Sequence, residues 1–337
     1  MQPTQLPASF YTEPSQFKIE QNRILERHWL VLGHVGMVSN GQTLARQIGS
    51  KTVLLARDPE GTLRAFHNVC RHRAGPLAWP GQAAESCKAI RCKYHGWSYD
   101  WNGQLVNTPS FGEAIPLDTM PLKPIHCVER NGLIWVHLDS DDSQAAPQKS
   151  EAWDTIRDLS NFRLHQSASH QLACNWKVYA ENYLEGYHIP YMHPDLVKAL
   201  KMSTYRIDVK SGLISHHVTM RSESVHQGYW VFLWPNTAIN IYGNGASVER
   251  IVPISENQTE IVYQYLFLEG TSADEIADTI AESERLTKED AQICEAVQQN
   301  LESEVYTKGY LSPDHEQGVL AFQNWVMDAL ETGGLPC

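Results

Sequence analysis

The chain has 337 residues, of which 42% are hydrophobic and 20% charged, and its formal net charge is −12. This composition is typical of a soluble globular protein with room for two domains. The acidic balance argues against nucleic acid or an anionic membrane as a partner, because both need a basic surface. No apolar run approaches the roughly 20 residues that span a bilayer, and the first residues lack the pattern of a signal peptide. We therefore expect a cytoplasmic protein.

The predicted elements of the first half are mostly strands. Residues 14–29 have the apolar spacing of a short helix. From about residue 40 to 140 the pattern is that of strands, with hairpin signals at the turn 58–61 and at the Asn-Gly pair 102–103. Residues 139–150 are polar and contain a proline, which indicates a linker between two domains.

The second half mixes helices with strands. A helical pattern over residues 176–187 ends near a proline, and strand patterns follow between residues 213 and 270. Residues 273–304 predict one long helix. We expect an α+β domain in which an antiparallel sheet packs against this helix.

Two short segments of the first half combine cysteine with histidine. The seven cysteines are odd in number and scattered, so a disulfide framework is not expected. Cys70-x-His72 and Cys92-x-x-His95 supply two thiolates and two imidazoles at the predicted tips of two hairpin loops. Such a set can bind zinc or a [2Fe–2S] cluster, and one Cys with one His in each loop favours the cluster. Cys87 lacks a partner histidine, so we interpret it as a free thiol. The alternative is two unrelated polar turns.

The segments "CRHRAG" and "CKYHGWSYDWNG" resemble the Rieske motif of Rieske non-haem iron oxygenases, the terminal alpha subunits of ring-hydroxylating systems. The resemblance extends from about residue 5 to 330. It implies that Cys70 and Cys92 bind one iron of the cluster and that His72 and His95 bind the other. Histidine ligation raises the reduction potential to between about −150 and +300 mV, so the cluster can accept electrons from a ferredoxin.

A second metal site is predicted in the second half. His188 and His193 lie five residues apart, and the neighbouring prolines break the helix so that both rings can turn to one point. Two histidines and one carboxylate form the facial triad of non-haem Fe(II) oxygenases. Asp290 lies on an otherwise apolar helix face, and the resemblance points to it as the third ligand, with Glu289 as the alternative. The alternative is that His188 and His193 are hydrogen-bonded surface histidines and that Asp290 is a solvated helix carboxylate.

The resemblance also implies the domain organisation. An N-terminal helix in residues 1–35 packs on the catalytic domain, and residues 36–140 form an all-β Rieske [2Fe–2S] domain. Residues 141–150 are the linker. Residues 151–337 form a helix-grip (START-like) catalytic domain that binds mononuclear Fe(II), with the substrate between its sheet and its long helix.

The implied function is that of the terminal oxygenase in a multicomponent Rieske system. Such an enzyme uses O₂ to hydroxylate or demethylate a small organic substrate. Its electrons come from a separate NAD(P)H-dependent reductase or a ferredoxin, since the chain has no Gly-rich dinucleotide motif of its own. The alternatives are an aromatic ring-hydroxylating dioxygenase, a Rieske electron carrier without oxygenase activity, and a START-like lipid-binding module.

Glu185 occupies the position where most of the family has an aspartate. A glutamate there is similar to the quaternary-amine oxygenases. The resemblance implies a homotrimer in which Glu185 bridges His188 to the neighbouring subunit's cluster ligand His95. A set of aromatic residues could form a box for a quaternary ammonium cation, although aromatic residues in strands are more often core: Tyr229, Trp230, Trp234 and Tyr242.

Overall fold

The computed structural model describes residues 2–3, 6–112, 116–138, 156–221 and 226–332. The chain divides into two compact units, Glu26–Gln148 and Met1–Leu25 together with Lys149–Cys337. We refer to them as the β unit and the α+β unit and describe each by itself.

The first domain boundary differs from the predicted one at residues 35/36. Strand β2 (Leu30–His34) pairs with β11 (Leu133–His137), so these residues belong to the sheet of the β unit and not to the N-terminal helix. The predicted helix over 14–29 is also shorter, because α2 ends at Glu20 and a π-helical turn ends at Leu25. The predicted linker 141–150 lies outside the described residues.

The β unit is built on an antiparallel sheet of seven strands in the order β2-β11-β10-β5-β4-β3-β6. Its other strands are β3 (Gln42–Ile48), β4 (Lys51–Arg57), β5 (Leu63–His67), β6 (Glu85–Ser86) and β10 (Pro124–Arg130). A smaller sheet contains β7 (Ile90–Arg91), β8 (Ser98–Tyr99) and β9 (Leu105–Asn107). The predicted hairpin at residues 58–61 is confirmed as the connection of β4 to β5.

The α+β unit is built on a second antiparallel sheet of seven strands in the order β12-β18-β17-β16-β15-β14-β13. The strands are β12 (Arg163–Leu172), β13 (Leu200–Lys210), β14 (Leu213–Met220), β15 (His226–Leu233), β16 (Thr237–Tyr242), β17 (Gly245–Ser255) and β18 (Gln258–Phe267). Within each strand every second side chain faces the helices, so the strand register determines which residues lie on this inner face.

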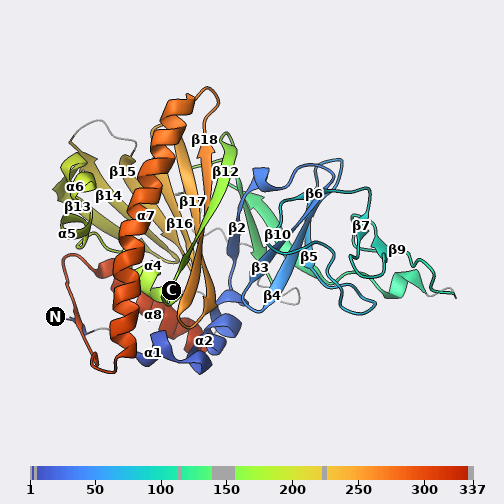
Figure 1. Cartoon of the computed structure of the whole chain (residues 1–337), viewed down its shortest axis with the longest axis horizontal. Coiled ribbons are helices and arrows are strands. Elements are labelled where there is room, and N and C mark those ends of the chain that lie inside the picture. Colours follow the sequence, from blue (N-terminus) through green and yellow to red (C-terminus); the bar gives the residue numbers. More distant parts are fainter. Residues whose placement is uncertain (1, 4–5, 113–115, 139–155, 222–225, 333–337) are drawn as a thin grey trace. The chain divides into compact units, whose positions relative to one another are not determined.

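The helices of this unit are α1 (Ser9–Thr12), α2 (Pro14–Glu20), α4 (Trp176–Tyr183), α5 (Ile189–Met192), α6 (Pro194–Ala199), α7 (Ala273–Glu302) and α8 (Gln317–Thr332). The short strands β1 (Gln2–Pro3) and β19 (Tyr310–Leu311) pair with each other. Figure 1 shows α7 running across the sheet. Its first turn is fixed by a capping box between Ser272 and Glu275.

Helix α4 lies between the sheet and the N-terminal helices, and its packing fixes the segment that follows it. Asn175 caps the helix by accepting from the Lys177 backbone N–H at 3.0 Å. The buried Lys177 ammonium contacts both carboxylate oxygens of Glu20, at 2.8 and 2.7 Å. The helix ends at Tyr183, four residues before the predicted end, so residues 184–188 form a turn that leads into α5.

Candidate metal centres

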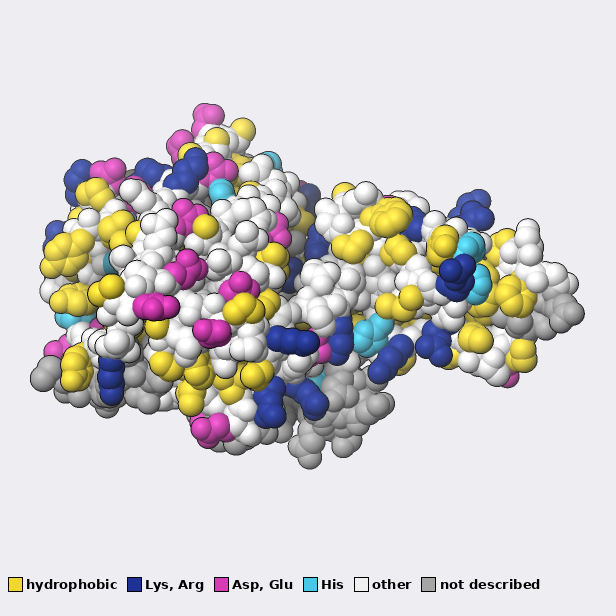
Figure 2. Space-filling model, turned by 60° about the horizontal axis from the view of Figure 1, so that its bottom comes forward, with side chains coloured by type: hydrophobic (Ala, Val, Ile, Leu, Met, Phe, Trp, Pro, Cys, Tyr) yellow, Lys and Arg dark blue, Asp and Glu magenta, His cyan; other side chains and the backbone are white. Residues whose placement is uncertain are grey.

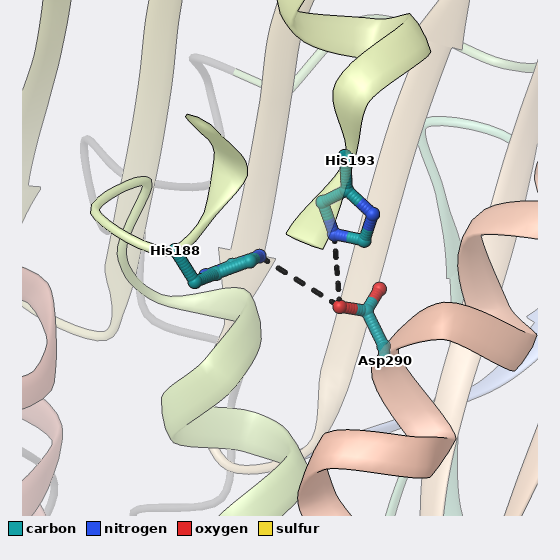
Figure 3. A group of neighbouring side chains, drawn as sticks. All are labelled: His188, His193 and Asp290. Atoms are coloured by element: carbon teal, nitrogen blue, oxygen red, sulfur yellow. Dashed lines mark hydrogen bonds and ion pairs between the residues drawn. The ribbon is translucent and has the colours of Figure 1, made fainter. Parts of the chain in front are cut away.

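Three side chains of the α+β unit converge on one point. His193 Nε2 lies 3.0 Å from Asp290 Oδ1, and His188 Nε2 lies 3.7 Å from the same oxygen. One potential ligand atom from each of the three residues lies within 4.8 Å of the others. Figure 3 shows both imidazole rings directed at the Asp290 carboxylate, which projects from α7. We call this group the triad; the structure brings together the three residues that the sequence predicted as iron ligands.

The prolines near the two histidines turn both rings inward. Pro190 lies in the first turn of α5 and Pro194 is the first residue of α6, so each short helix begins beside one of the histidines. Between them His193 has φ −120° and ψ 70°, which is neither helical nor extended. The chain therefore changes direction at His193, as the prediction of a broken helix required.

The outer ring nitrogens of both histidines are bound by carboxylates. His188 Nδ1 contacts Glu185 Oε1, and His193 Nδ1 lies 2.6 Å from Glu289 Oε2. Each carboxylate fixes the orientation of its imidazole and leaves Nε2 directed at the triad, as is common around metal-binding histidines. Glu289, our alternative third ligand, is therefore not a member of the triad, and its other oxygen accepts from Arg285 at 2.5 Å.

The triad is rich in negative charge. Asn182 Nδ2 donates to Asp290 Oδ1 at 2.8 Å, and both glutamates lie just outside the three residues. Burial lowers the pKa of His193, but the hydrogen bonds and charges of Asp290 and Glu289 outweigh it and raise the pKa above its usual value. Two imidazole nitrogens and one carboxylate form the donor set of a facial Fe(II) site with open positions. The residues therefore fit a divalent cation.

In the β unit, Cys70 and Cys92 are buried and their thiols interact. The ring centroids of His72 and His95 lie 4.8 Å apart. The turn between β7 and β8 carries Cys92 and His95, as expected for a hairpin loop. Cys70 and His72 lie instead in a loop between β5 and β6, which are not neighbours in the sheet. This part of the two-hairpin prediction is wrong, but the four side chains still come together.

The surroundings of the four residues fit a cluster. His72 stacks on Trp97 at 4.6 Å, and its Nδ1 is buried without a hydrogen-bond partner among the described residues. Gly75 allows the two loops to touch, because a Cβ atom there would lie 3.0 Å from Cys92 Sγ. Burial raises the pKa of the Cys70 thiol and the nearby Cys92 raises it further, so the site favours a thiolate only when a metal cation is bound.

Cys87 lies apart from this group. Its thiol contacts Thr43 of β3, and its backbone N–H donates to the Gly41 carbonyl oxygen at 3.0 Å. These contacts agree with the interpretation of Cys87 as a free thiol.

The four aromatic residues of the predicted box do not all lie on one face of the sheet. Trp230 faces the helices and stacks on His216, with 5.5 Å between the ring centroids, whereas Tyr229 contacts His217 on the opposite face of the sheet. Trp234 packs against Phe322 and Trp325 of α8. Tyr242 is buried, and its hydroxyl lies 3.1 Å from Ser247 Oγ. Tyr229 therefore cannot share a box with Trp230, because neighbouring residues on one strand face opposite sides of the sheet. A substrate pocket that contains Trp230, Trp234 and Tyr242 stays a prediction.

Sequence reasoning missed two polar residues next to the triad. Asn182 donates to Asp290, and the buried Glu249 of β17 accepts from Tyr179 Oη at 2.6 Å. A glutamate within the apolar segment "ASVERIVPI" was the available signal for Glu249. Its contacts depend on the strand register, which the pattern alone does not give.

Comparison with known proteins defines the class. The family model "Rieske [2Fe-2S] domain" matches residues 28–123, and the model "Ring hydroxylating alpha subunit (catalytic domain)" matches residues 159–210 and 202–332. The chain therefore belongs to the Rieske non-haem iron oxygenases, as an alpha subunit. It is an oxygenase with a Rieske [2Fe–2S] cluster and a mononuclear iron, and the fold, enzyme class and cofactors predicted from the sequence are confirmed. The electron-carrier and lipid-binding alternatives are wrong.

Individual relatives of the chain have more narrowly defined substrates than the family models. The chain is 30% identical to choline monooxygenase from Beta vulgaris, over 96% of this chain and 77% of that protein. It is 26% identical to the glycine betaine monooxygenase oxygenase subunit of Chromohalobacter salexigens, over 96% and 85%. The crystal structure of a quaternary ammonium Rieske monooxygenase has the same fold, with a TM-score of 0.87 at 22% identity, covering 98% of this chain and 96% of that one. Among the described residues, none of the helices has the length and apolar character needed to cross a membrane.

Proposed function

We propose that this chain is the terminal oxygenase for a small quaternary ammonium compound, which it hydroxylates or demethylates. The observation that carries the proposal is the triad of His188, His193 and Asp290 in a chain whose relatives include choline and glycine betaine monooxygenases. In this proposal the three residues bind Fe(II), and Glu185 and Glu289 hold the imidazoles through Nδ1. When bound, the cluster supplies single electrons and the mononuclear iron supplies O₂ activation.

Cys70, Cys92, His72 and His95 are proposed as the four cluster ligands, and this assignment makes a direct prediction. Cys92→Ser is expected to abolish the visible absorption of the cluster and the EPR signal of its reduced state, because a hydroxyl is a poor replacement for thiolate. Cys87→Ser is the matched control and keeps both signals, since its thiol contacts Thr43 instead. If Cys87→Ser bleaches the protein as Cys92→Ser does, the ligand assignment is overturned.

Electrons are proposed to come from NAD(P)H through a separate reductase or ferredoxin, and the working form to be a homotrimer. Glu185 lines a cavity of about 440 Å³ that also contains the Glu316 carboxylate. The cluster loops are basic by contrast, with exposed Arg71 and Arg73 on either side of His72, and His95 is exposed as well. Figure 2 shows histidine, basic and hydrophobic side chains together on the surface of the β unit. The opposite charges support docking of one subunit's loops at Glu185 of the next.

A cytoplasmic location, expected from the sequence, stays part of the proposal. The choline monooxygenase from Beta vulgaris is named as a chloroplastic protein.

The test of the substrate class is NADH-dependent O₂ uptake with a surrogate reductase. We expect choline, glycine betaine or L-carnitine to stimulate uptake, with the oxidised or demethylated amine as product in amounts that match the O₂ consumed. Aromatic acids serve as the comparison. Stimulation by aromatic acids alone would overturn the quaternary-amine assignment and favour a ring-hydroxylating dioxygenase.

A further inference from the structure

Glu249 is a fully enclosed carboxylate in the middle of the α+β unit. Its side chain lies on the inner face of β17 and the residue is 1% exposed. Oε1 accepts from the Tyr179 hydroxyl of α4 at 2.6 Å, and Oε2 accepts from Asn240 Nδ2 of β16 at 3.4 Å. The Tyr263 hydroxyl of β18 lies 3.3 Å from that of Tyr179. Both carboxylate oxygens are thus hydrogen-bonded by neutral groups.

Among the described residues, no lysine or arginine forms an ion pair with Glu249. The other buried acid of this unit shows the contrast, since Glu20 is paired with the Lys177 ammonium at 2.7 Å. Removing a carboxylate from water is costly unless a cation compensates it. The hydrogen bonds from Tyr179 and Asn240 reach both oxygens of Glu249 but bring no positive charge, so the fold leaves the negative charge to be balanced from outside the chain.

Two separate contacts place Glu249 next to the triad. Tyr179 precedes Asn182 by three residues on α4, and Asn182 donates to Asp290 at 2.8 Å. The Tyr263 hydroxyl lies 2.8 Å from Thr287 Oγ1, and Thr287 precedes Asp290 by three residues on α7. Because residues three apart are neighbours on a helix surface, both hydrogen-bonded routes from Glu249 reach α4 or α7 one helical turn from Asn182 or Asp290, and the Asp290 charge acts on Glu249.

We propose that Glu249, together with the phenol rings of Tyr179 and Tyr263, is the anionic pole that selects a quaternary ammonium group in the substrate site. The inference rests on the proposed function and assigns its substrate recognition to this residue. A trimethylammonium group has no N–H to donate, so Glu249 attracts it by charge while Tyr179 and Asn240 keep donating to the carboxylate oxygens. Aromatic rings next to the charge add cation–π attraction.

The protonation of Glu249 gives a second signature. The pKa of Glu249 is raised to about 7, because burial and the Asp290 charge on α7 raise it by more than the hydrogen bonds from Tyr179 and Tyr263 lower it. Asn240 of β16 also donates to it, which favours the charged form. A bound cation stabilises the ionised carboxylate. Amine affinity is therefore expected to fall as the pH is lowered through about 7, where the carboxylate gains a proton.

The test is Glu249→Gln, which keeps the shape and removes the charge. Calorimetry on the iron-loaded holoenzyme measures binding of choline, glycine betaine and L-carnitine, and of their tert-butyl analogues in which carbon replaces the quaternary nitrogen. We expect wild type to prefer an amine over its analogue. Glu249→Gln is expected to weaken amine binding about 10²- to 10³-fold, the scale of removing one partner of a buried charge pair. Binding of the analogue is expected to stay unchanged, and amine affinity is expected to lose its dependence on pH near 7.

Glu181→Gln is the matched control. This carboxylate lies on α4 as well, accepts from Tyr11 Oη at 2.6 Å and Gln323 Nε2 at 3.1 Å, and borders the cavity rather than the sheet. It is expected to keep the amine preference. Iron content and the cluster spectrum verify folding of each variant, and Glu249→Met is the second neutral variant if glutamine prevents folding.

The outcomes separate the two proposals. If wild type binds none of the three amines, the proposed substrate class is overturned, and with it the role of Glu249. If wild type binds an amine and a folded neutral variant at position 249 keeps both affinity and preference over the analogue, only the role of Glu249 is overturned. Loss of preference at Glu249 with retention in Glu181→Gln supports the anionic pole.

Discussion

Asp290→Ala is expected to abolish turnover and to lower the iron content from about three per chain, two in the cluster and one in the triad, to about two. Asp290 Oδ1 is the atom toward which both His188 Nε2 and His193 Nε2 are directed. Without it two imidazoles remain, and a two-ligand site binds a divalent cation weakly. The cluster lies in the other unit and is expected to keep its absorption. Iron analysis and the visible spectrum of the same sample measure both effects.

The neighbouring Glu289 provides the matched control for this prediction. Glu289→Gln removes a charge one residue away but keeps an oxygen that can accept from His193 Nδ1. We expect it to retain the mononuclear iron in preparations with excess Fe(II), with affinity about 10- to 100-fold weaker, as for other outer partners of metal ligands. If Asp290→Ala kept its iron and its turnover while Glu289→Gln lost both, the third ligand would be Glu289.

The residues of the two metal centres could be predicted because their chemistry is local. Cys70 with His72 and Cys92 with His95 are each within three residues, and the prolines near His188 and His193 indicate the broken helix. Asp290 is about 100 residues away, and its place was predicted from its unusual position on an apolar face and from the family resemblance. The orienting role of Glu289 could not be predicted. Glu289 and Asp290 are adjacent acidic residues on one helix, and which of them faces the histidines depends on how α7 is rotated about its axis when it packs against the sheet.

Substrate recognition was harder to predict, because it depends on strand register. Glu249 lies opposite Tyr263 on β18 and Ala238 on β16, and a shift of one residue would turn it to the other face. The aromatic residues chosen from the sequence lie on one long apolar stretch, which the structure divides into β15, a turn that contains Trp234, and β16. Tyr229 alone lies on the opposite face from Trp230, and the pattern could not show this without the register of β15.

The helices and strands also divide into those that local sequence signals predict and those that depend on contacts between distant residues. Helix α7 spans residues 273–302, and the predicted range was 273–304. The prediction was close because a capping box and apolar spacing are local signals in the sequence. Strand β12 was missed, since most of its side chains are exposed at the edge of the sheet and its sequence lacks an apolar pattern. The Rieske boundary was misplaced because the pairing of β2 with β11 joins residues about 100 positions apart.

Glu185→Gln is expected to retain both metal centres and the trimer but to turn over about 10²-fold more slowly, the scale of losing an outer partner of a metal ligand. One oxygen of Glu185 contacts His188 Nδ1, and the other accepts from the backbone N–H groups of Tyr187 and His188. A carboxylate has about four acceptor positions, and these contacts use three. One position remains for a donor outside the chain.

In the proposed trimer this donor is the ring N–H of His95 from the neighbouring subunit. A negative carboxylate attracts that N–H and orients both imidazoles at once. The glutamine amide has one oxygen acceptor in place of two, so it cannot serve His188 and His95 together. The loss is therefore expected in electron delivery and not in substrate binding.

Single-turnover measurements with the cluster pre-reduced separate these steps. In Glu185→Gln the cluster is expected to stay reduced after substrate and O₂ are added, while amine affinity remains that of wild type. Glu185→Asp restores the charge that most of the family has at this position, and it should recover most of the rate. Cluster oxidation at the wild-type rate in Glu185→Gln would place the route between subunits elsewhere. Equal losses in the Gln and Asp variants would mean that Glu185 acts only through the turn of residues 185–188 that it caps.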